Sequence, residues 1–214
     1  MRNSSELGYD GSSNLAAAVC TAISPKAVGK GVLVVLNNEV NAAAEVTKTN
    51  TLSLNTFQSP YGPLGIIDTN DFIVYRDIAY RQHIETDIVE RKVDLIKAVI
   101  DMDERFIRSS VDLGAEGIVI EAMGRGNVSP KMLEGIRYAI EKGVVVVIVS
   151  RCHSGRVFES YGYAGGGKEL SDLGVIMGGD MRGPKARLKL MLALGKTKDR
   201  NQISKLFKEE SCSI

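Results

Sequence analysis

The chain has 214 residues, of which 44% are hydrophobic and 25% are charged, and its formal net charge is +1. These values are ordinary for a globular protein and leave room for one large domain or two small ones. The balanced charge and the absence of tryptophan disfavour a surface that binds nucleic acid. No apolar run approaches the length of a membrane span, and residues 1–13 lack the apolar core of a signal peptide. We therefore expect neither a nucleic-acid nor a membrane partner.

The cysteines and histidines indicate no metal or disulfide chemistry. Cys20, Cys152 and Cys212 are an odd number at wide spacing, which fits neither a disulfide framework nor a zinc pattern. The only histidines are His83 and His153, which disfavours a histidine-rich metal site. Because free thiols are typical of a reducing compartment, we expect a cytoplasmic protein without metal or cofactor. Cys152 and His153 are adjacent but lack an identifiable third partner, and we interpret the pair as structural.

The first third of the chain alternates helix, strand and turn. Residues 11–23 have small and apolar residues at helical spacing, with Ser12 or Ser13 as the expected N-cap. Residues 31–40 read as one buried strand, residues 59–68 as turns, and residues 71–77 as a short strand. A helix followed by a buried strand predicts an α/β fold with a parallel sheet.

The rest of the chain repeats this alternation after a polar stretch at residues 81–90. The clearest helix spans residues 129–143, where Ser129 can cap, Pro130 suits the first helical position and Gly143 the stop. Residues 144–152 are apolar throughout and predict a strand buried on both faces. We expect a small α/β unit of about four strands. Its other predicted elements are a helix beginning near residue 105, strands at 117–123 and 173–179, and helices at 183–195 and 199–210.

Lys48 is the most specific candidate for a functional residue. It stands in "EVTKTNT" (45–51), among threonines and an asparagine, just beyond the predicted strand. Open α/β sheets bind ligands at such strand ends, and a desolvated lysine can accept a proton from a neighbouring hydroxyl nucleophile. The alternative is an ordinary surface lysine in a loop, which is the commoner role of this residue type.

Two glycine-containing loops in the second half are further candidates. "GRGN" (124–127) lies between a strand and a helix, where glycines let the backbone approach an anion at a helix N-terminus. It lacks the spacing and the lysine of a nucleotide-binding loop, so turn glycines are the alternative. "SYGYAGGGKEL" (160–170) has the composition of a mobile loop that carries Tyr161 or Tyr163 over a site, and a flexible surface loop is the alternative.

Several segments together resemble one family, the bacterial L-asparaginases, which are threonine-nucleophile amidohydrolases. They occur in the order and at the separations found there, and the resemblance runs from residue 1 to about residue 207. The enzymes of that family are longer than this chain. The segments that carry the resemblance are "YDGSSNL" (9–15), "GVLVVLNNEV" (31–40), "EVTKTNT" (45–51), "YGPLG" (61–65), "GRGN" (124–127) and "GPKARLKLMLAL" (183–194).

The resemblance implies an organisation of the α/β fold. Residues 1–80 would be the C-terminal portion of a doubly wound N-terminal α/β domain, and residues 81–90 a linker. Residues 91–214 would form a smaller, flavodoxin-like or Rossmann-like α/β domain with a parallel sheet. It also implies a homo-oligomer that takes L-asparagine and releases L-aspartate.

The resemblance also implies roles for four residues. Family members have one threonine nucleophile in a TGGTI-type motif and a Thr-Asp pair in an HGTDT-type motif, which a lysine completes. Lys48 matches that lysine, whereas neither motif occurs in these 214 residues. Asn127 matches an asparagine that reaches the active site of a neighbouring subunit. The loop with Tyr161 and Tyr163 resembles a subgroup that uses tyrosine where other members donate a glutamate, so we expect both tyrosines to bind substrate.

We therefore expect an L-asparaginase that works through an acyl-threonine intermediate, without metal or cofactor. Because the nucleophile motif is missing, we expect this chain alone to be inactive. A truncated gene, a split gene with a separate N-terminal fragment, or a designed fragment would each explain this. The alternatives are a non-catalytic oligomerisation or small-ligand-binding module, and the asparaginase-like subunit of an archaeal-type tRNA amidotransferase, against which the near-neutral charge speaks.

The absence of the two motifs also leads us to expect that residues 1–80 are less stable than residues 91–214. A doubly wound sheet without its leading strands exposes an edge and an apolar face. We expect residues 1–80 to be loosely ordered, to pair with another copy, or to rely on a missing partner. Residues 91–214 should fold independently.

Overall fold

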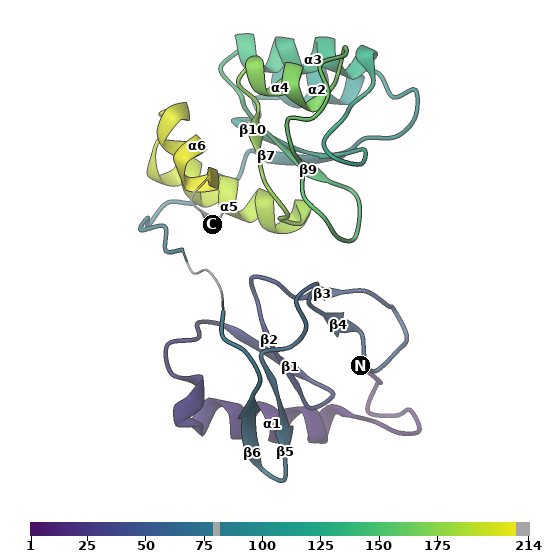
Figure 1. The fold of residues 1–214 in the computed structure, drawn as a ribbon, viewed down its shortest axis with the longest axis vertical. Helices are drawn as coiled ribbons and strands as arrows, with labels where there is room; N and C mark the ends of the chain where they lie inside the picture. The colour runs from purple at the N-terminus through teal and green to yellow at the C-terminus, as the bar shows by residue number, and fades with distance from the viewer. Residues whose placement is uncertain (79–81, 209–214) are drawn as a thin grey trace. The chain divides into compact units, whose positions relative to one another are not determined.

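The chain divides into two compact units, unit 1 (Met1–Arg81) and unit 2 (Gln82–Ile214) (Figure 1). The computed structural model describes residues 1–78 and 82–208. The predicted domain boundary at residues 80 and 81, the last two residues of the predicted helix 199–210, and Cys212 lie outside the described residues.

Within residues 1–78, unit 1 has one α-helix, one short 3₁₀ helix, and a four-stranded antiparallel sheet with the order β1-β2-β5-β6, together with a small hairpin, β3-β4. The α/β class is confirmed, although these strands are antiparallel, whereas the helix–strand order predicted parallel pairing. The elements are α1 (Gly11–Ile23), the short 3₁₀ helix η1 (Pro25–Ala27), β1 (Leu33–Leu36), β2 (Glu39–Ala42), β3 (Thr47–Lys48), β4 (Phe57–Gln58), β5 (Gly65–Asp68) and β6 (Asp71–Val74).

The prediction of one strand over residues 31–40 is wrong. The segment folds back on itself as the hairpin β1-β2, because Asn37 and Asn38 adopt φ angles of 53° and 60°. Two successive residues with positive φ form the tight turn that matches the twist of a hairpin, and asparagine tolerates this conformation. Thr69 and Asn70, with φ angles of 46° and 66°, do the same between β5 and β6. The predicted turn region 59–68 therefore contains strand β5.

The start of α1 also differs from the prediction. The N-cap residue is Asp10, not Ser12 or Ser13, and its side chain makes no capping hydrogen bond. Its carboxylate instead accepts hydrogen bonds from the Arg2 backbone N–H and the Asn14 side chain, both at 2.8 Å. The helix therefore begins at Gly11 and leaves both serines exposed within its first turn.

Unit 2 contains the predicted parallel sheet. Its strand order is β10-β9-β8-β7, with helices α2, α3 and α4 on one face and α5 and α6 on the other (Figure 1). The strands are β7 (Val93–Lys97), β8 (Gly117–Ala122), β9 (Val145–Ser150) and β10 (Ile176–Met177); the helices are α2 (Arg105–Asp112), α3 (Pro130–Glu141), α4 (Gly167–Asp172), α5 (Gly183–Lys196) and α6 (Arg200–Lys208).

Hydrophobic clusters lie on both faces of this sheet. In β9 the side chains of Val146 and Ile148 join the cluster under α2, α3 and α4, whereas Val145, Val147 and Val149 join that under α5 and α6. All of β9 is buried, which confirms the prediction of a strand covered on both faces.

The helix predicted from Ser129 and Pro130 is confirmed as α3. The Ser129 hydroxyl accepts a hydrogen bond from the Met132 backbone N–H at 3.1 Å, which satisfies one free donor at the helix start. Within residues 1–78 and 82–208, no helix is both long and apolar enough to cross a membrane.

Candidate functional site

Lys48 lies on β3, in a small hairpin of unit 1. Thr47 pairs with Gln58 and Lys48 with Phe57, so the lysine backbone is held by the antiparallel ladder. Val46, just before it, is buried, whereas the Lys48 side chain is exposed. The hairpin therefore anchors the chain below the lysine and leaves its ammonium group at the surface.

Threonine and asparagine side chains fix the loop that follows Lys48. The Thr49 hydroxyl and backbone N–H both donate to the Thr56 carbonyl oxygen, at 3.0 and 2.8 Å. The Thr56 hydroxyl, fully buried, donates to the Asn50 carbonyl oxygen and accepts from the Asn50 N–H. The Asn50 side chain in turn accepts from the N–H groups of Leu52 and Ser53. The richness in Thr and Asn is thus explained by local turn chemistry.

A half-buried ion pair holds the residues on either side of the hairpin. The Glu45 carboxylate accepts from the Arg76 guanidinium and, at 3.1 Å, from the Ser59 hydroxyl. Arg76 also donates to the Gly62 carbonyl oxygen at 2.5 Å. Because Arg76 already neutralises Glu45, the nearest carboxylate in sequence is not available to Lys48. Among residues 1–78 and 82–208, the Lys48 ammonium has no hydrogen-bond or ion-pair partner.

Asn127 lies in unit 2, in the loop that follows β8. Its backbone closes on Met123 through N–H to carbonyl bonds of 2.9 Å in both directions, and the Gly126 N–H also donates to Met123. Gly124 and Gly126 have positive φ angles of 51° and 113°. Because Met123 takes the N–H groups of Gly126 and Asn127, the loop is a closed turn and does not offer them to an anion.

The Asn127 side chain has an unused acceptor. Its amide oxygen is buried and has no hydrogen-bond partner within the described part of the chain. Leaving a buried acceptor unpaired costs on the order of 1–3 kcal/mol, so such an atom is a natural contact for an incoming donor. An N–H or ammonium group is the kind of partner that this oxygen would accept.

Tyr161 and Tyr163 form an exposed pair on the loop before α4. Their ring centroids are 5.5 Å apart, and 45% and 54% of the two residues' surfaces are exposed. The Tyr161 carbonyl oxygen accepts from the Lys168 N–H, and that of Tyr163 from the Gly166 N–H. The backbone below the rings is therefore tied to the first turn of α4.

The three glycines after this pair have a packing role. A Cβ atom would lie 2.5 Å from the Val128 carbonyl oxygen at Gly165, 2.4 Å from that of Tyr161 at Gly166, and 2.6 Å from that of Phe158 at Gly167. All three glycines are buried, and Gly167 begins α4. Close backbone approach therefore explains the run of glycines, which the sequence alone indicated as the hinge of a mobile loop.

The Asn127 loop and the tyrosine loop are bonded to each other. The Phe158 N–H donates to the Arg125 carbonyl oxygen and the Val128 N–H to that of Gly165, each at 2.9 Å. The Arg125 guanidinium also lies over the Phe158 ring, 5.2 Å from its centroid. Unit 2 thus brings the segments of Asn127, Tyr161 and Tyr163 together beyond the carboxyl ends of β8 and β9, where open α/β sheets place ligands.

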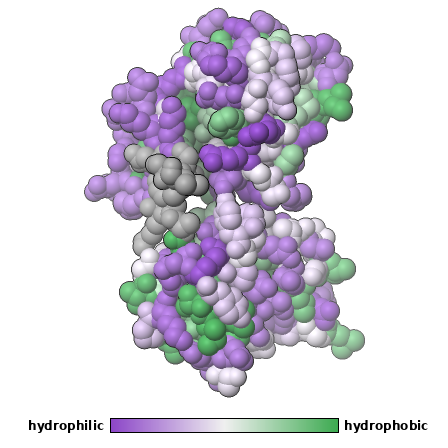
Figure 2. Space-filling view, in the orientation of Figure 1, coloured by the Kyte–Doolittle hydropathy of each residue, from purple (hydrophilic) through white to green (hydrophobic). Residues whose placement is uncertain are grey.

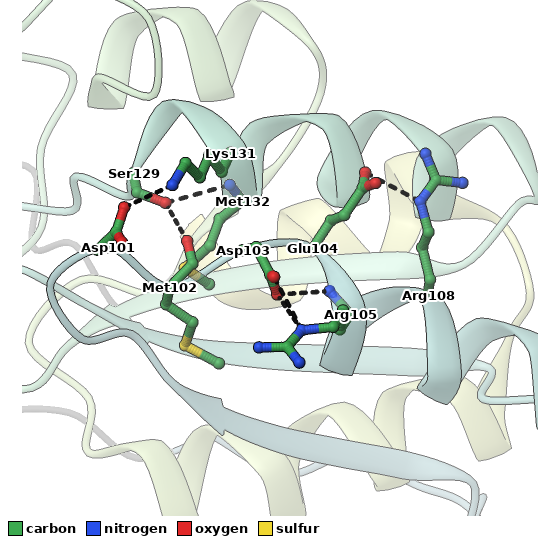
Figure 3. Close-up of polar contacts among 9 residues, drawn as sticks. All are labelled: Asp101, Met102, Asp103, Glu104, Arg105, Arg108, Ser129, Lys131 and Met132. Carbon is green, nitrogen blue, oxygen red and sulfur yellow. Dashed lines mark hydrogen bonds and ion pairs between the residues drawn. The ribbon is translucent and has the colours of Figure 1, made fainter.

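A polar cluster fixes the chain after Asn127 (Figure 3). The Ser129 hydroxyl, besides capping α3, donates to the Met102 carbonyl oxygen in the segment after β7. Lys131 forms an ion pair with Asp101 at 2.7 Å, which raises the pKa of Lys131. Hydrogen bonds from Arg105 lower the pKa of Asp103. These contacts join the ends of β7 and β8 at the edge of the sheet that carries Asn127.

Sequence reasoning missed two supports of this site. The Ser150 hydroxyl at the end of β9 donates to the Gly124 carbonyl oxygen at 2.6 Å and accepts from the Cys152 N–H. Arg125 packs on Phe158, which lies 33 positions later. Both contacts join distant segments, so no local spacing signals them. Within the described residues, no group of His, Cys, Asp and Glu side chains is arranged to hold a metal ion.

Two protein-family models match the chain. Residues 1–80 match the model described as asparaginase, N-terminal, and residues 92–207 match the glutaminase/asparaginase C-terminal domain. The second match alone covers more than half of the chain.

Curated relatives carry related names. An L-asparaginase of Bacillus licheniformis is 38% identical over 193 residues, which cover 90% of this chain and 60% of the relative. The probable periplasmic L-asparaginase of Haemophilus influenzae is 36% identical, over 98% of this chain and 60% of its own. A glutamyl-tRNA(Gln) amidotransferase subunit of Methanobrevibacter smithii is 32% identical over 174 residues, which cover 78% of this chain and 39% of that protein. The chain thus spans about 60% of the length of both L-asparaginases.

Proposed function

We propose that this chain, which belongs to the asparaginase family, supplies the lysine and the C-terminal domain of an L-asparaginase. The reaction is the hydrolysis of L-asparagine to L-aspartate and ammonia, and it needs no metal or cofactor from this chain. Both family-model matches and the named L-asparaginases support this function.

The observation that carries the proposal is the placement of Lys48. Its backbone is held in the β3-β4 hairpin and the preceding Glu45 is neutralised by Arg76, while the Lys48 side chain is exposed. A fixed lysine whose ammonium is not engaged within the described residues is suited to receive a hydroxyl from another segment. Covering by that segment would desolvate Lys48 and favour its neutral amine, which is assigned as the proton acceptor for a threonine-centred group.

The proposed chemistry uses a threonine that lies outside these 214 residues. Its hydroxyl attacks the side-chain amide carbon of asparagine, and the proton passes toward the leaving nitrogen, which departs as ammonia. Water then hydrolyses the acyl-threonine ester and releases aspartate. Lys48, as a neutral amine, relays one of these protons: from the hydroxyl nucleophile to the leaving nitrogen, or from this water to the threonine oxygen that is set free. Because the present sequence holds neither the TGGTI nor the HGTDT motif, the chain alone is expected to be inactive.

Unit 2 contributes substrate contacts in this proposal. Asn127 has a buried, unpartnered amide oxygen suited to a substrate ammonium or another N–H donor. Tyr161 and Tyr163 supply exposed phenol groups on the adjoining loop. By the family resemblance these residues act in a neighbouring subunit, so the active form would be a homo-oligomer.

The test is ammonia release from asparagine by the 214-residue chain, alone and refolded together with the part of the Bacillus licheniformis relative that it does not span. We expect activity only in the mixture, and its loss by about 10³-fold or more in Lys48→Ala, the scale seen when one member of a catalytic unit is removed. Lys205→Ala is the matched control, since Lys205 is also exposed but lies on α6. Activity of the chain alone, or equal activity of both variants in the mixture, would refute the assignment.

A second candidate is the ammonia-producing subunit of a tRNA amidotransferase. The relative of Methanobrevibacter smithii favours it, although only 39% of that protein is covered. Glutamine as the better donor, together with tRNA-dependent stimulation, would select this function over asparagine catabolism. Saturable binding of aspartate without ammonia release in any mixture would instead favour the non-catalytic binding or oligomerisation module.

We place the reaction in the cytoplasm, because Cys20 and Cys152 are free thiols. The name of the Haemophilus influenzae relative records a periplasmic protein, which makes the periplasm the alternative. Fractionation of the producing cells, with a cytoplasmic and a periplasmic marker enzyme, decides between the two.

A further inference from the structure

The hairpin that carries Lys48 is a small element with little structure of its own. Strands β3 and β4 have two residues each and, among the described strands, pair only with each other, so the hairpin is separate from the four-stranded sheet of unit 1 (Figure 1). An isolated two-stranded hairpin is marginally stable at best in water. The position of Lys48 therefore depends on contacts that join the hairpin to the rest of unit 1.

Apolar packing fixes the hairpin only in part. Val46, just before β3, is buried, but Leu52, in the loop between β3 and β4, is 84% exposed. Figure 2 shows further hydrophobic residues on the surface of unit 1, among hydrophilic ones. Hydrophobic burial is also non-directional, so Val46 can anchor the hairpin without fixing its orientation. The orientation therefore depends on directional contacts.

The Glu45–Arg76 ion pair is such a directional contact. Two guanidinium nitrogens of Arg76 each donate to one carboxylate oxygen of Glu45, Nη1 to Oε1 at 3.3 Å and Nη2 to Oε2. Glu45 stands three residues before Lys48, and its carboxylate also accepts from the hydroxyl of Ser59, directly after β4, at 3.1 Å. The carboxylate thus joins the two ends of the hairpin, and the bidentate pair fixes their orientation toward Arg76.

Arg76 is in turn bound to the main sheet. It lies two residues after β6, and its backbone N–H donates to the Leu64 carbonyl oxygen, directly before β5, at 3.2 Å. The side chains of Glu45 and Arg76 are 12% and 25% exposed, so solvent ions screen the pair less than a fully exposed pair. A continuous set of contacts therefore runs from β6 through Arg76 and Glu45 to the hairpin of Lys48.

Stability alone does not account for this pair. Desolvation offsets much of the attraction between two partly buried charges. The Nε–H of Arg76 is also buried and has no hydrogen-bond partner within residues 1–78 and 82–208, which carries a further cost. Because Arg76 and Ser59 already occupy the Glu45 carboxylate, Glu45 is not offered to Lys48 as a proton partner. What the pair supplies to Lys48 is a fixed geometry.

We propose that Glu45 and Arg76 are positioning residues for Lys48. Their ion pair holds the β3-β4 hairpin in one orientation on unit 1, so that the Lys48 side chain is presented to the threonine-centred group from a fixed backbone. This inference rests on the proposed function, which assigns the proton transfer to Lys48. Neither Glu45 nor Arg76 is assigned a proton-transfer step of its own.

Backbone hydrogen exchange of the 214-residue chain, resolved by NMR, tests the positioning without any need for activity. The Thr49 N–H, directly after Lys48, bonds across the hairpin at 2.8 Å, and the Ile67 N–H bonds to the neighbouring strand pair of the main sheet at 2.8 Å. Glu45→Ala should accelerate exchange at Thr49 by at least about tenfold and leave Ile67 within about twofold, because only the hairpin is released. Asp71→Ala, which removes an exposed ion pair of the same unit, is the control and should change neither amide.

Kinetics in the mixture test the consequence for catalysis. The chain is refolded with the unspanned segment of the Bacillus licheniformis relative, and kcat and KM for ammonia release are measured. Glu45→Ala should lower kcat by about 100-fold and change KM by less than about threefold, because a displaced proton acceptor slows the chemical step while the proposed substrate contacts lie in unit 2. Arg76→Lys, which keeps the charge without the two parallel bonds, should retain an intermediate kcat.

A double variant guards against misfolding of the single one. Glu45→Ala combined with Arg76→Ala leaves neither charge buried without its partner. Because the two residues act as one unit, the double variant should lose no more kcat than Glu45→Ala alone. A double variant that loses the product of both single effects would show that the residues act independently, which overturns the role of the pair.

The outcomes separate this inference from the proposed function. Faster exchange at Thr49 alone, with a loss in kcat that Asp71→Ala does not share, supports the positioning role. Unchanged exchange at Thr49, or equal acceleration at Thr49 and Ile67, overturns it. Full kcat in Glu45→Ala, in a mixture that Lys48→Ala inactivates, overturns the positioning role and leaves the proposed function in place. Full activity of Lys48→Ala, or no ammonia release from the unsubstituted mixture, overturns the proposed function and with it the role of the pair.

Discussion

Unit 1 and unit 2 both combine helices with a sheet, but within residues 1–78 and 82–208 only unit 2 has α-helices on both faces of its sheet. In unit 2 one hydrophobic cluster joins β7, β8 and β9 to α2, α3 and α4, and a second joins the same sheet to α5 and α6. Within residues 1–78, α1 is the only α-helix of unit 1. The buried hydrophobic residues of this unit within 1–78 are Ala17, Val40, Ala42, Val46, Leu64 and Phe72.

This difference bears on where stability and function reside. Burying apolar area contributes about 25 cal/mol per Å², so the unit with the larger set of buried apolar residues is stabilised more. Unit 2 holds the complete layers and the loop cluster around Asn127. Unit 1 holds Lys48, the residue to which we assign chemistry, on the unit with the smaller core. We propose that Lys48 acts only together with a segment that supplies the threonine nucleophile.

The largest expected effect is a difference in protease resistance between unit 1 and unit 2. Limited proteolysis of the chain should remove unit 1 first and leave a resistant fragment that begins near residue 82, because local opening is easiest where few apolar contacts are made. Mass spectrometry of the surviving fragment identifies the unit. Preferential loss of residues 91–214 would break the comparison and refute independent folding of unit 2.

Alanine substitutions at Gly165 and Gly155 test how much close packing contributes to the stability of unit 2. Gly165→Ala should lower the free energy of unfolding by roughly 1–2 kcal/mol for a positive φ and about 1–3 kcal/mol more for overpacking against the Val128 carbonyl oxygen. Gly155→Ala is the control, since Gly155 also has a positive φ but open space around it. Urea unfolding followed by tyrosine fluorescence measures both. Equal losses would mean that close packing at Gly165 is not what fixes the tyrosine loop.

The sequence predicted unit 2 well because its signals are local. Ser129 and Pro130 marked the start of α3, and the run of valines marked β9. Strand β7 was not predicted, because its buried residues Val93 and Ile96 lie three positions apart among exposed residues and so do not show the alternation of a strand.

Unit 1 was predicted less well. Its fold depends on a two-residue turn that is easily overlooked in the sequence and on contacts between residues far apart in the chain. The Asn37–Asn38 turn, which splits residues 31–40 into two strands, is a local signal that sequence reasoning overlooked. The Glu45–Arg76 ion pair joins residues 31 positions apart. The roles of Lys48 and Asn127 remain predictions, because they depend on groups outside the described chain. Composition alone cannot distinguish a glycine that permits motion from one that permits close packing, as Gly165 shows.

The smallest expected effect is on the acid stability of unit 2. A hydrogen bond from the Lys92 N–H, and then one from Lys198, lower the pKa of Glu90 below its usual value of 4.5. A lowered carboxylate pKa stabilises the folded state above 4.5, and this contribution is lost as the pH falls through the folded-state pKa. Glu90→Gln should therefore reduce the acid-induced loss of stability by less than about 1 kcal/mol. Unfolding at a series of acidic pH values tests this, with the exposed Glu141→Gln as control; an unchanged pH dependence in Glu90→Gln would contradict it.

Hydrogen–deuterium exchange of the whole chain, with and without the unspanned segment of the Bacillus licheniformis relative, tests the central claim most directly. We predict that amides of α1 and β1 exchange rapidly in the chain alone and slow by at least about tenfold when the segment binds, while amides of β8 and β9 stay protected throughout. The claim is that unit 1 relies on a further segment for its stability. Protection of α1 and β1 equal to that of β8 and β9 in the chain alone would contradict this claim.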